Sequence, residues 1–107
     1  MSSLDFKRKD YYNQIYDYYK LMLTHKQKQY FELYFQNDYT LEEIAEQFNV
    51  TKSAIHDSIS KVTKILDSLE ENIGQYKRVK NIKLILRSFE KGDISKFQMI
   101  KQIEEEL

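Results

Sequence analysis

Apolar residues recur at helical spacing along almost the whole 107-residue chain. Side chains three and four positions apart share one face of an α-helix, so this spacing predicts helices. They are expected at about residues 5–23, 25–36 and 75–91, with others beginning after Thr40, Thr51 and Ser95. The pattern predicts an all-α protein, a compact helical bundle of five to six helices, with residues 1–107 as a single domain.

The first predicted helix carries more aromatic residues than one core contact needs. One stripe consists of Tyr11, Ile15, Tyr18 and Met22, and Tyr12, Tyr16 and Tyr19 widen it. Such a broad apolar face is either buried within the chain or used as a contact between two chains. A homodimer and a monomer therefore both remain open, with the homodimer slightly favoured.

The later helices show narrower apolar faces, bounded by capping residues. Thr24, Thr51 and Ser95 are suited to begin helices, whereas Gly74 and Gly92 are suited to interrupt or end them. The predicted buried residues are Tyr30, Phe31, Tyr34 and Phe35; Ile55, Ile59, Val62, Leu66 and Leu69; Tyr76, Val79, Ile82, Leu86 and Phe89; and Phe97, Ile100 and Ile103. Glu104–Glu106 oppose the dipole at a helix C-terminus, so this end is expected to fray.

A helix-turn-helix is predicted at about residues 40–62, which read TLEEIAEQFNVTKSAIHDSISKV. Thr40 and Glu43 form a capping-box pattern, and Asn49 tolerates the left-handed conformation needed for a tight turn. Ala45 is small enough to let the two helices cross closely. The residues expected to fill the angle between the helices are Ile44, Phe48, Val50 and Ile55. A plain helical hairpin is the alternative.

The longer segment LTHKQKQYFELYFQNDYTLEEIAEQFNVTKSAIHDSISKV resembles the fourth domain of bacterial sigma factors. It is more similar still to the small YlxM/p13 family of helix-turn-helix proteins. The resemblance is good over about residues 10–75 and weak in the C-terminal third. It implies an all-helical fold, and a regulatory role associated with the signal recognition particle pathway.

The second helix of the motif is poor in groups that read DNA bases. Its outward positions, which are candidate binding residues, are Thr51, Lys52, Ser53, His56, Asp57, Ser60 and Lys61. Arginine, the commonest reader of guanine, is absent from them. Residues 40–69 hold three Lys against five Asp and Glu, a balance of −2. Because phosphate contacts supply most of the affinity for DNA, this motif alone should bind DNA weakly.

Positive charge gathers instead in a predicted basic helix at about residues 75–91. Six Lys and Arg face one Glu there, a balance of +5. The candidate contacts are Lys77, Lys80, Lys83 and Arg87. This face is either simply solvated or binds phosphates of RNA or DNA. A lysine-rich helix suits RNA, whose A-form helices are recognised by shape and backbone.

Composition argues against an enzyme. The chain has no cysteine and only two histidines, His25 and His56, at no metal-ligand spacing, so no metal or other cofactor is expected. It also has no glycine-rich phosphate loop. No apolar run is longer than three residues, the length of Leu84–Leu86, so membrane insertion is not expected. The sequence predicts a cytoplasmic protein.

Three functions remain open. The first is a regulatory factor that binds the RNA or the protein of the signal recognition particle. The second is a sigma-like DNA-binding transcription regulator. The third is a protein–protein adaptor, in which the helix-turn-helix only provides a scaffold.

Overall fold

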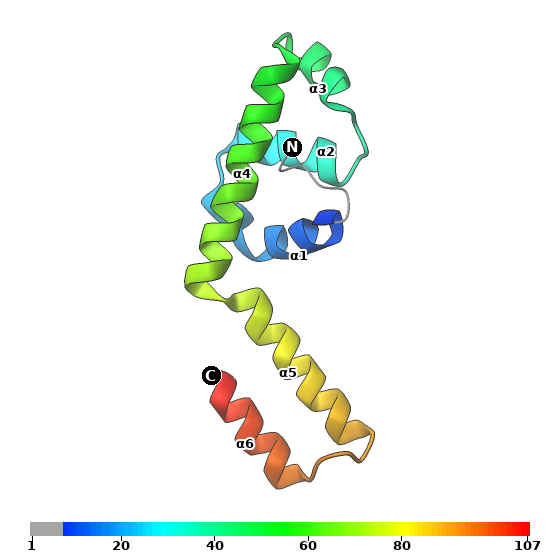
Figure 1. The fold of residues 1–107 in the computed structure, drawn as a ribbon, viewed down its shortest axis with the longest axis vertical. Coiled ribbons are helices and arrows are strands. Elements are labelled where there is room, and N and C mark those ends of the chain that lie inside the picture. The colour runs from blue at the N-terminus through cyan, green and yellow to red at the C-terminus, as the bar shows by residue number, and fades with distance from the viewer. Residues whose placement is uncertain (1–7) are drawn as a thin grey trace. The chain divides into compact units, whose positions relative to one another are not determined.

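The computed structural model describes residues 8–107, which form six α-helices, one 3₁₀ helix and no strand (Figure 1). The elements are α1 (Lys9–Tyr19), η2 (Lys20–Met22), α2 (His25–Phe35), α3 (Leu41–Phe48), α4 (Lys52–Ile73), α5 (Gln75–Glu90) and α6 (Lys96–Glu106). The all-α class and the number of helices are therefore confirmed. The predicted first helix starts at residues 5–7, which lie outside the described range, and it ends in the 3₁₀ turn of η2.

The chain divides into two compact units, where the sequence predicts one domain. The first unit extends to Asn72 and the second comprises Ile73–Leu107. Gly74, at φ 70°, separates α4 from α5. A left-handed residue cannot continue an α-helix, so α4 ends there and α5 begins as a separate helix.

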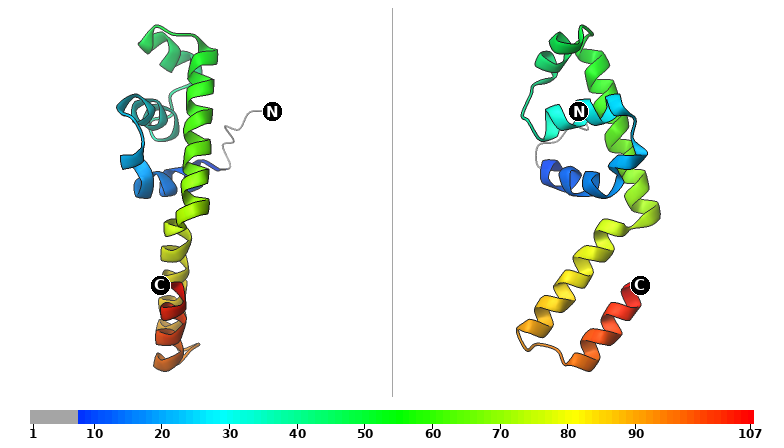
Figure 2. Two further views of the ribbon diagram at one scale, coloured as in Figure 1. Left: turned by 90° about the vertical axis from the view of Figure 1, so that its left-hand side faces the viewer. Right: turned by 180° about the vertical axis from the view of Figure 1, so that it is seen from behind.

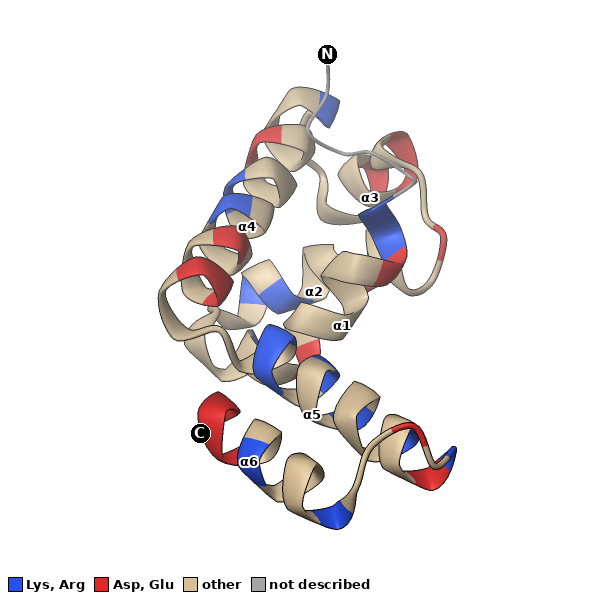
Figure 3. Cartoon of the chain, turned by 60° about the horizontal axis from the view of Figure 1, so that its bottom comes forward, with Lys and Arg blue, Asp and Glu red and all other residues tan. Residues whose placement is uncertain are grey.

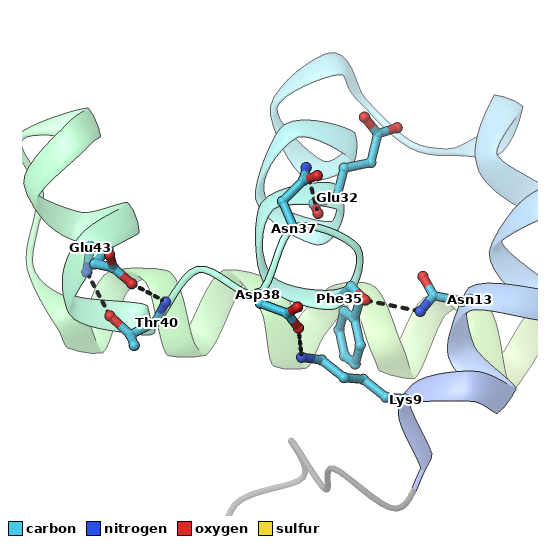
Figure 4. Close-up of polar contacts among 8 residues, drawn as sticks. All are labelled: Lys9, Asn13, Glu32, Phe35, Asn37, Asp38, Thr40 and Glu43. Carbon is cyan, nitrogen blue, oxygen red and sulfur yellow. Dashed lines mark hydrogen bonds and ion pairs between the residues drawn. The ribbon is translucent and has the colours of Figure 1, made fainter.

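The predicted helix starts are confirmed by their capping bonds. Thr24, Thr40 and Ser95 each form a reciprocal capping box with the residue three positions later. In the box of Thr40, the hydroxyl accepts from the Glu43 N–H at 3.1 Å, and the Glu43 carboxylate accepts from the Thr40 N–H at 2.9 Å (Figure 4). Each box satisfies backbone donors that a helix start otherwise leaves unpaired.

The core of the first unit forms where α1 and α2 run across α4 (Figures 1 and 2). Tyr16 stacks on Phe31, with ring centroids 4.2 Å apart, and Phe31 stacks on Phe35 at 4.5 Å. The side chains that α4 contributes, Ile55, Ile59, Val62 and Leu66, are fully buried. Burial of these apolar and aromatic groups is the main stabilisation of this unit.

Tyrosine hydroxyls bond α1 to its neighbours. The Tyr12 hydroxyl donates to Asp67 Oδ2 at 3.0 Å and the Tyr19 hydroxyl to Glu70 Oε1 at 2.7 Å, both on α4, while Tyr16 donates to Glu32 on α2. Burial, and next the hydrogen bond to Asp67, raise the pKa of Tyr12 to about 12. Each ring can therefore be buried while its hydroxyl keeps a partner.

The buried face of α1 is rotated relative to the predicted stripe. Tyr12, Ile15, Tyr16 and Tyr19 are buried, whereas Tyr18 is 40% exposed and Met22 is 65% exposed. Tyr18 and Met22 are therefore not buried within the chain, and a contact between two chains, the other alternative for this stripe, stays a prediction. With apolar residues on so many positions, spacing alone cannot tell which arc of the helix packs inward.

The second unit is a hairpin of α5 and α6, and neither helix buries a side chain fully. Arg78 Nε donates to the Glu106 carbonyl at 2.9 Å, and Asn81 Nδ2 to Glu106 Oε1 at 3.0 Å. These bonds hold the end of α6, which reaches Glu106, so the expected fraying of Glu104–Glu106 is wrong.

The predicted cores of α5 and α6 are also wrong in part. Leu86, Phe89, Phe97 and Ile100 are between 39% and 69% exposed. Each helix of a two-helix hairpin packs against one neighbour, which covers only one of its flanks. Apolar side chains on the other flanks therefore stay exposed to solvent.

Candidate nucleic-acid interface

The helix-turn-helix is formed by α3, a tight turn and the first three turns of α4. Asn49 adopts the left-handed conformation, with φ 54° and ψ 48°. The Val50 N–H donates to the Ala45 carbonyl at 3.0 Å, and the Asn49 N–H to the Glu46 carbonyl at 3.3 Å. These two bonds are those of a Schellman motif, which satisfies the last carbonyls of α3. The prediction of two helices around a turn is confirmed.

The interior of this motif differs from the prediction at one residue. Ile44 and Ile55 are fully buried and Ala45 is 6% exposed, whereas Val50 is 42% exposed. The expectation that Val50 fills the angle between the helices is therefore wrong. Val50 belongs to the turn itself, whereas Ile44 of α3 and Ile55 of α4 are the fully buried residues of the motif.

The seven candidate residues of α4 and its N-cap are all at least partly accessible to solvent. Thr51, Lys52, Ser53, Asp57 and Lys61 are exposed, and His56 and Ser60 are half-buried. The Thr51 hydroxyl accepts from the Ala54 N–H at 3.0 Å, so it also caps α4. Five of the seven candidate residues are thus exposed at the start of α4, and the other two are half-buried beside them.

The charges on this surface are largely compensated within the protein. Lys52 Nζ lies 2.9 Å from Glu42 Oε1 of α3, and His56 Nδ1 lies 3.6 Å from Asp57 Oδ1. Both side chains of the Lys52–Glu42 pair are 62% exposed, so this is a surface ion pair of small energy. The surface therefore offers hydroxyl groups together with the exposed side chains of Lys52 and Lys61.

The basic residues of the second unit are arranged differently. Lys77, Lys80, Lys83 and Arg87 are all exposed on α5, where Lys and Arg recur along the helix (Figure 3). Lys80, Lys83 and Arg87, spaced three and four positions apart, share one face. Arg78 does not belong to that face, because its guanidinium bonds Glu106, Gln75 and Ile73.

The candidate residues therefore form two sets, one in each unit. The seven around α4 belong to the first unit and the four on α5 to the second. Sequence reasoning missed Glu42, which compensates Lys52. Its position in the first turn of α3 indicates a helix start, but nothing in the spacing of residues 42 and 52 indicates an ion pair.

Within residues 8–107 no group of three or more His, Cys, Asp or Glu side chains could hold a metal ion. Over the same range, no helix combines the length and the apolar character needed to span a bilayer.

Comparison with known proteins places this fold in a family. Residues 6–106 match the model of a family described as "helix-turn-helix protein, YlxM / p13 like". The chain is 41% identical over 93 residues to a UPF0122 protein of Mycoplasma capricolum, covering 87% of this chain and 82% of that one. It is 38% identical over 100 residues to a UPF0122 protein of Lactococcus lactis, covering 88% and 90% of the two chains. A Geobacillus protein of the same name is 32% identical over 100 residues, covering 87% and 91%. The chain belongs to the YlxM/p13-like family of helix-turn-helix proteins.

Proposed function

We propose that this protein is a regulatory factor that binds the RNA of the signal recognition particle through the basic face of α5. The supporting observation is that Lys80, Lys83 and Arg87 are exposed on one helix face, in a helix whose single acidic residue is Glu90. Phosphates attract such a face without requiring contact with base edges. The link to the particle rests on the resemblance to the YlxM/p13 family.

RNA is favoured over duplex DNA because of the charges around α4. A DNA-reading helix needs positive charge against the phosphates that flank the major groove. Here Lys52 is paired with Glu42, and Asp57 would face the phosphates. The basic face of α5, in contrast, can bind phosphates of any base sequence, which suits the backbone of an A-form RNA helix.

The test compares RNA and DNA binding by the full chain. Fluorescence anisotropy should be measured with signal recognition particle RNA and with duplex DNA of equal length, over a range of salt concentrations. Reversing Lys80, Lys83 and Arg87 to Glu should weaken RNA binding at least about tenfold and flatten its salt dependence. Reversal of Lys20, Lys26 and Lys64, an equal charge change in the first unit, is the control and should have a much smaller effect.

Two results would contradict this assignment. Salt-insensitive binding to the GTPase of the particle, without RNA binding, would indicate a protein–protein adaptor. A transcription regulator would be indicated by tight, sequence-selective DNA binding. That binding would survive reversal of the α5 charges and would be lost on replacing Lys52 and His56.

The DNA-binding alternative is favoured by the accessible face of α4, where Thr51, Ser53 and His56 could contact bases. It makes its own prediction about Glu42. Glu42→Gln should release Lys52 and strengthen non-specific DNA binding. A plot of the logarithm of the binding constant against the logarithm of the salt concentration should become steeper by about one. Glu46→Gln makes the same charge change on α3 without breaking this ion pair, so it should have a smaller effect. Equal effects of the two variants would show that the ion pair does not restrain Lys52.

A further inference from the structure

The hairpin of α5 and α6 leaves a large apolar face uncovered. Leu86 and Phe89 on α5 are 40% and 39% exposed, and Phe97 and Ile100 on α6 are 69% and 45% exposed. No side chain of either helix is fully buried. Exposed large apolar residues gathered on one small unit mark a surface that binds another protein surface.

The spacing of these residues is that of a helix bundle. On α5, Val79, Ile82, Leu86 and Phe89 follow each other at intervals of three, four and three. On α6, Phe97, Ile100 and Ile103 follow at intervals of three, and Leu107 comes directly after the end of the helix. Such a repeat keeps one apolar seam on the same side of a helix and allows it to pack against further helices.

The contact between α5 and α6 does not use up this seam. Arg78 and Asn81, which bond Glu106, lie on a different flank of α5 from Leu86. Asn81 also lines a groove with Leu84, Ile85 and Gln102, so this groove lies on the flank that faces α6. Leu86 and Phe89 nevertheless keep 40% and 39% of their surface exposed, so they remain accessible for a second contact.

The second unit is too small to bury a stable hydrophobic core without a contact to further helices. The 35 residues of the second unit are fewer than the roughly 40 below which a domain usually needs oligomerisation, a metal or disulfides. The chain contains no cysteine, so disulfides are excluded. Additional helices are the remaining source of buried apolar area.

The distribution of charge indicates which partner packs against the apolar face of the hairpin. Helix α5 carries Lys77, Arg78, Lys80, Lys83 and Arg87 against Glu90, whereas α6 ends in Glu104–Glu106. Two α5 helices side by side would repel each other. Glu106 already bonds α5 of its own chain, but the exposed Glu104 and Glu105 of another copy's α6 would complement the basic residues of α5. The hairpin is thus complementary to itself, as a twofold interface requires.

We propose that this face is a homodimer interface, in which α6 of each copy packs against the Val79–Phe89 stripe of the other copy's α5. The two hairpins form a four-helix bundle with alternating basic and acidic helices around its axis. This inference does not depend on the proposed RNA binding.

Sedimentation of the full chain over a range of concentrations tests the interface. The unmodified protein should change from monomer to dimer, and Leu86→Gln should raise the dissociation constant at least about tenfold, since each copy loses a buried leucine. Leu84→Gln is the matched control, because Leu84 is a leucine on the same helix, 48% exposed, outside the stripe. It should leave the dissociation constant within about twofold of the original.

A second measurement separates loss of the interface from loss of the hairpin. Because the chain lacks cysteine, Glu90→Cys provides a single position for a nitroxide label on α5. Labels in a dimer joined through the hairpin should show dipolar coupling that disappears on mixing with excess unlabelled chain. Circular dichroism of Leu86→Gln should show retained helix at high concentration.

Either of two results would overturn the proposal. One is a monomer at every concentration. The other is a dimer that Leu86→Gln leaves intact but Leu21→Gln disrupts, which would place the contact on the first unit, where Leu21 is 87% exposed.

Discussion

Asn49 illustrates how much of the helix-turn-helix depends on one residue. Its left-handed backbone ends α3 and sets the direction in which α4 begins. A side chain with a β-carbon normally avoids this conformation, and asparagine is among the few that adopt it readily. The tight turn thus follows from the chemistry of residue 49 and could be predicted without knowledge of the rest of the fold.

Tyr12 makes the stability of the first unit sensitive to alkaline pH. Its pKa is about 12 in the folded protein, against 10.0 for an ordinary tyrosine, because burial and the bond to Asp67 favour the neutral phenol. Its contribution to stability should therefore be fully present below pH 10 and lost as the pH rises toward about 12. We expect that loss to be on the order of 1–2 kcal/mol, since Asp67 is partly solvent-screened.

Urea unfolding at a series of pH values tests this effect. Tyr12→Phe should flatten the fall in the free energy of unfolding above pH 10. Asp67→Asn should flatten it only partly, because burial, the largest cause of the raised pKa, remains. An unchanged pH dependence in Tyr12→Phe would show that Tyr12 does not contribute.

At the scale of elements, the close packing within the helix-turn-helix depends on Ala45. Its side chain is 6% exposed beside the fully buried Ile44. Ala45→Leu should lower the free energy of unfolding by about 1–3 kcal/mol, because extra methylene groups overpack a tight contact. Ala54→Leu, on the exposed face of α4, is the control and should change it by less than about 0.5 kcal/mol. Denaturant unfolding measures both, and equal stabilities would contradict a close crossing at Ala45.

Element boundaries could be predicted well from the sequence, whereas burial could not. Thr24, Thr40 and Ser95 determine helix starts through bonds to residues three positions away, so the information is local. The exposure of Met22 and Leu86 depends instead on how many other helices pack nearby. The ion pair of Lys52 with Glu42 likewise requires the turn to bring together residues distant in sequence.

At the scale of the whole molecule, the two units should differ in local stability. The first has a core of fully buried side chains, and the second has none. Amide hydrogens of α5 and α6 should therefore exchange faster than those in the middle of α4 in dilute protein. If the hairpins dimerise, protection in α5 and α6 should increase with protein concentration, which mass spectrometry can follow. Equal protection of α4 and α5 in dilute protein would contradict this difference.

The bonds from α1 to α4 also constrain when the first unit can fold during synthesis. Tyr12 and Asp67 are 55 positions apart, and Tyr19 and Glu70 are 51 apart. A nascent chain that has left the ribosome only as far as α3 already contains half of the helix-turn-helix and can pack α1 against α2, yet the α4 residues that complete the cover of the aromatic face of α1 are still missing. Translation must proceed through Glu70 before that face can close, so a growing chain exposes it to chaperones until α4 emerges.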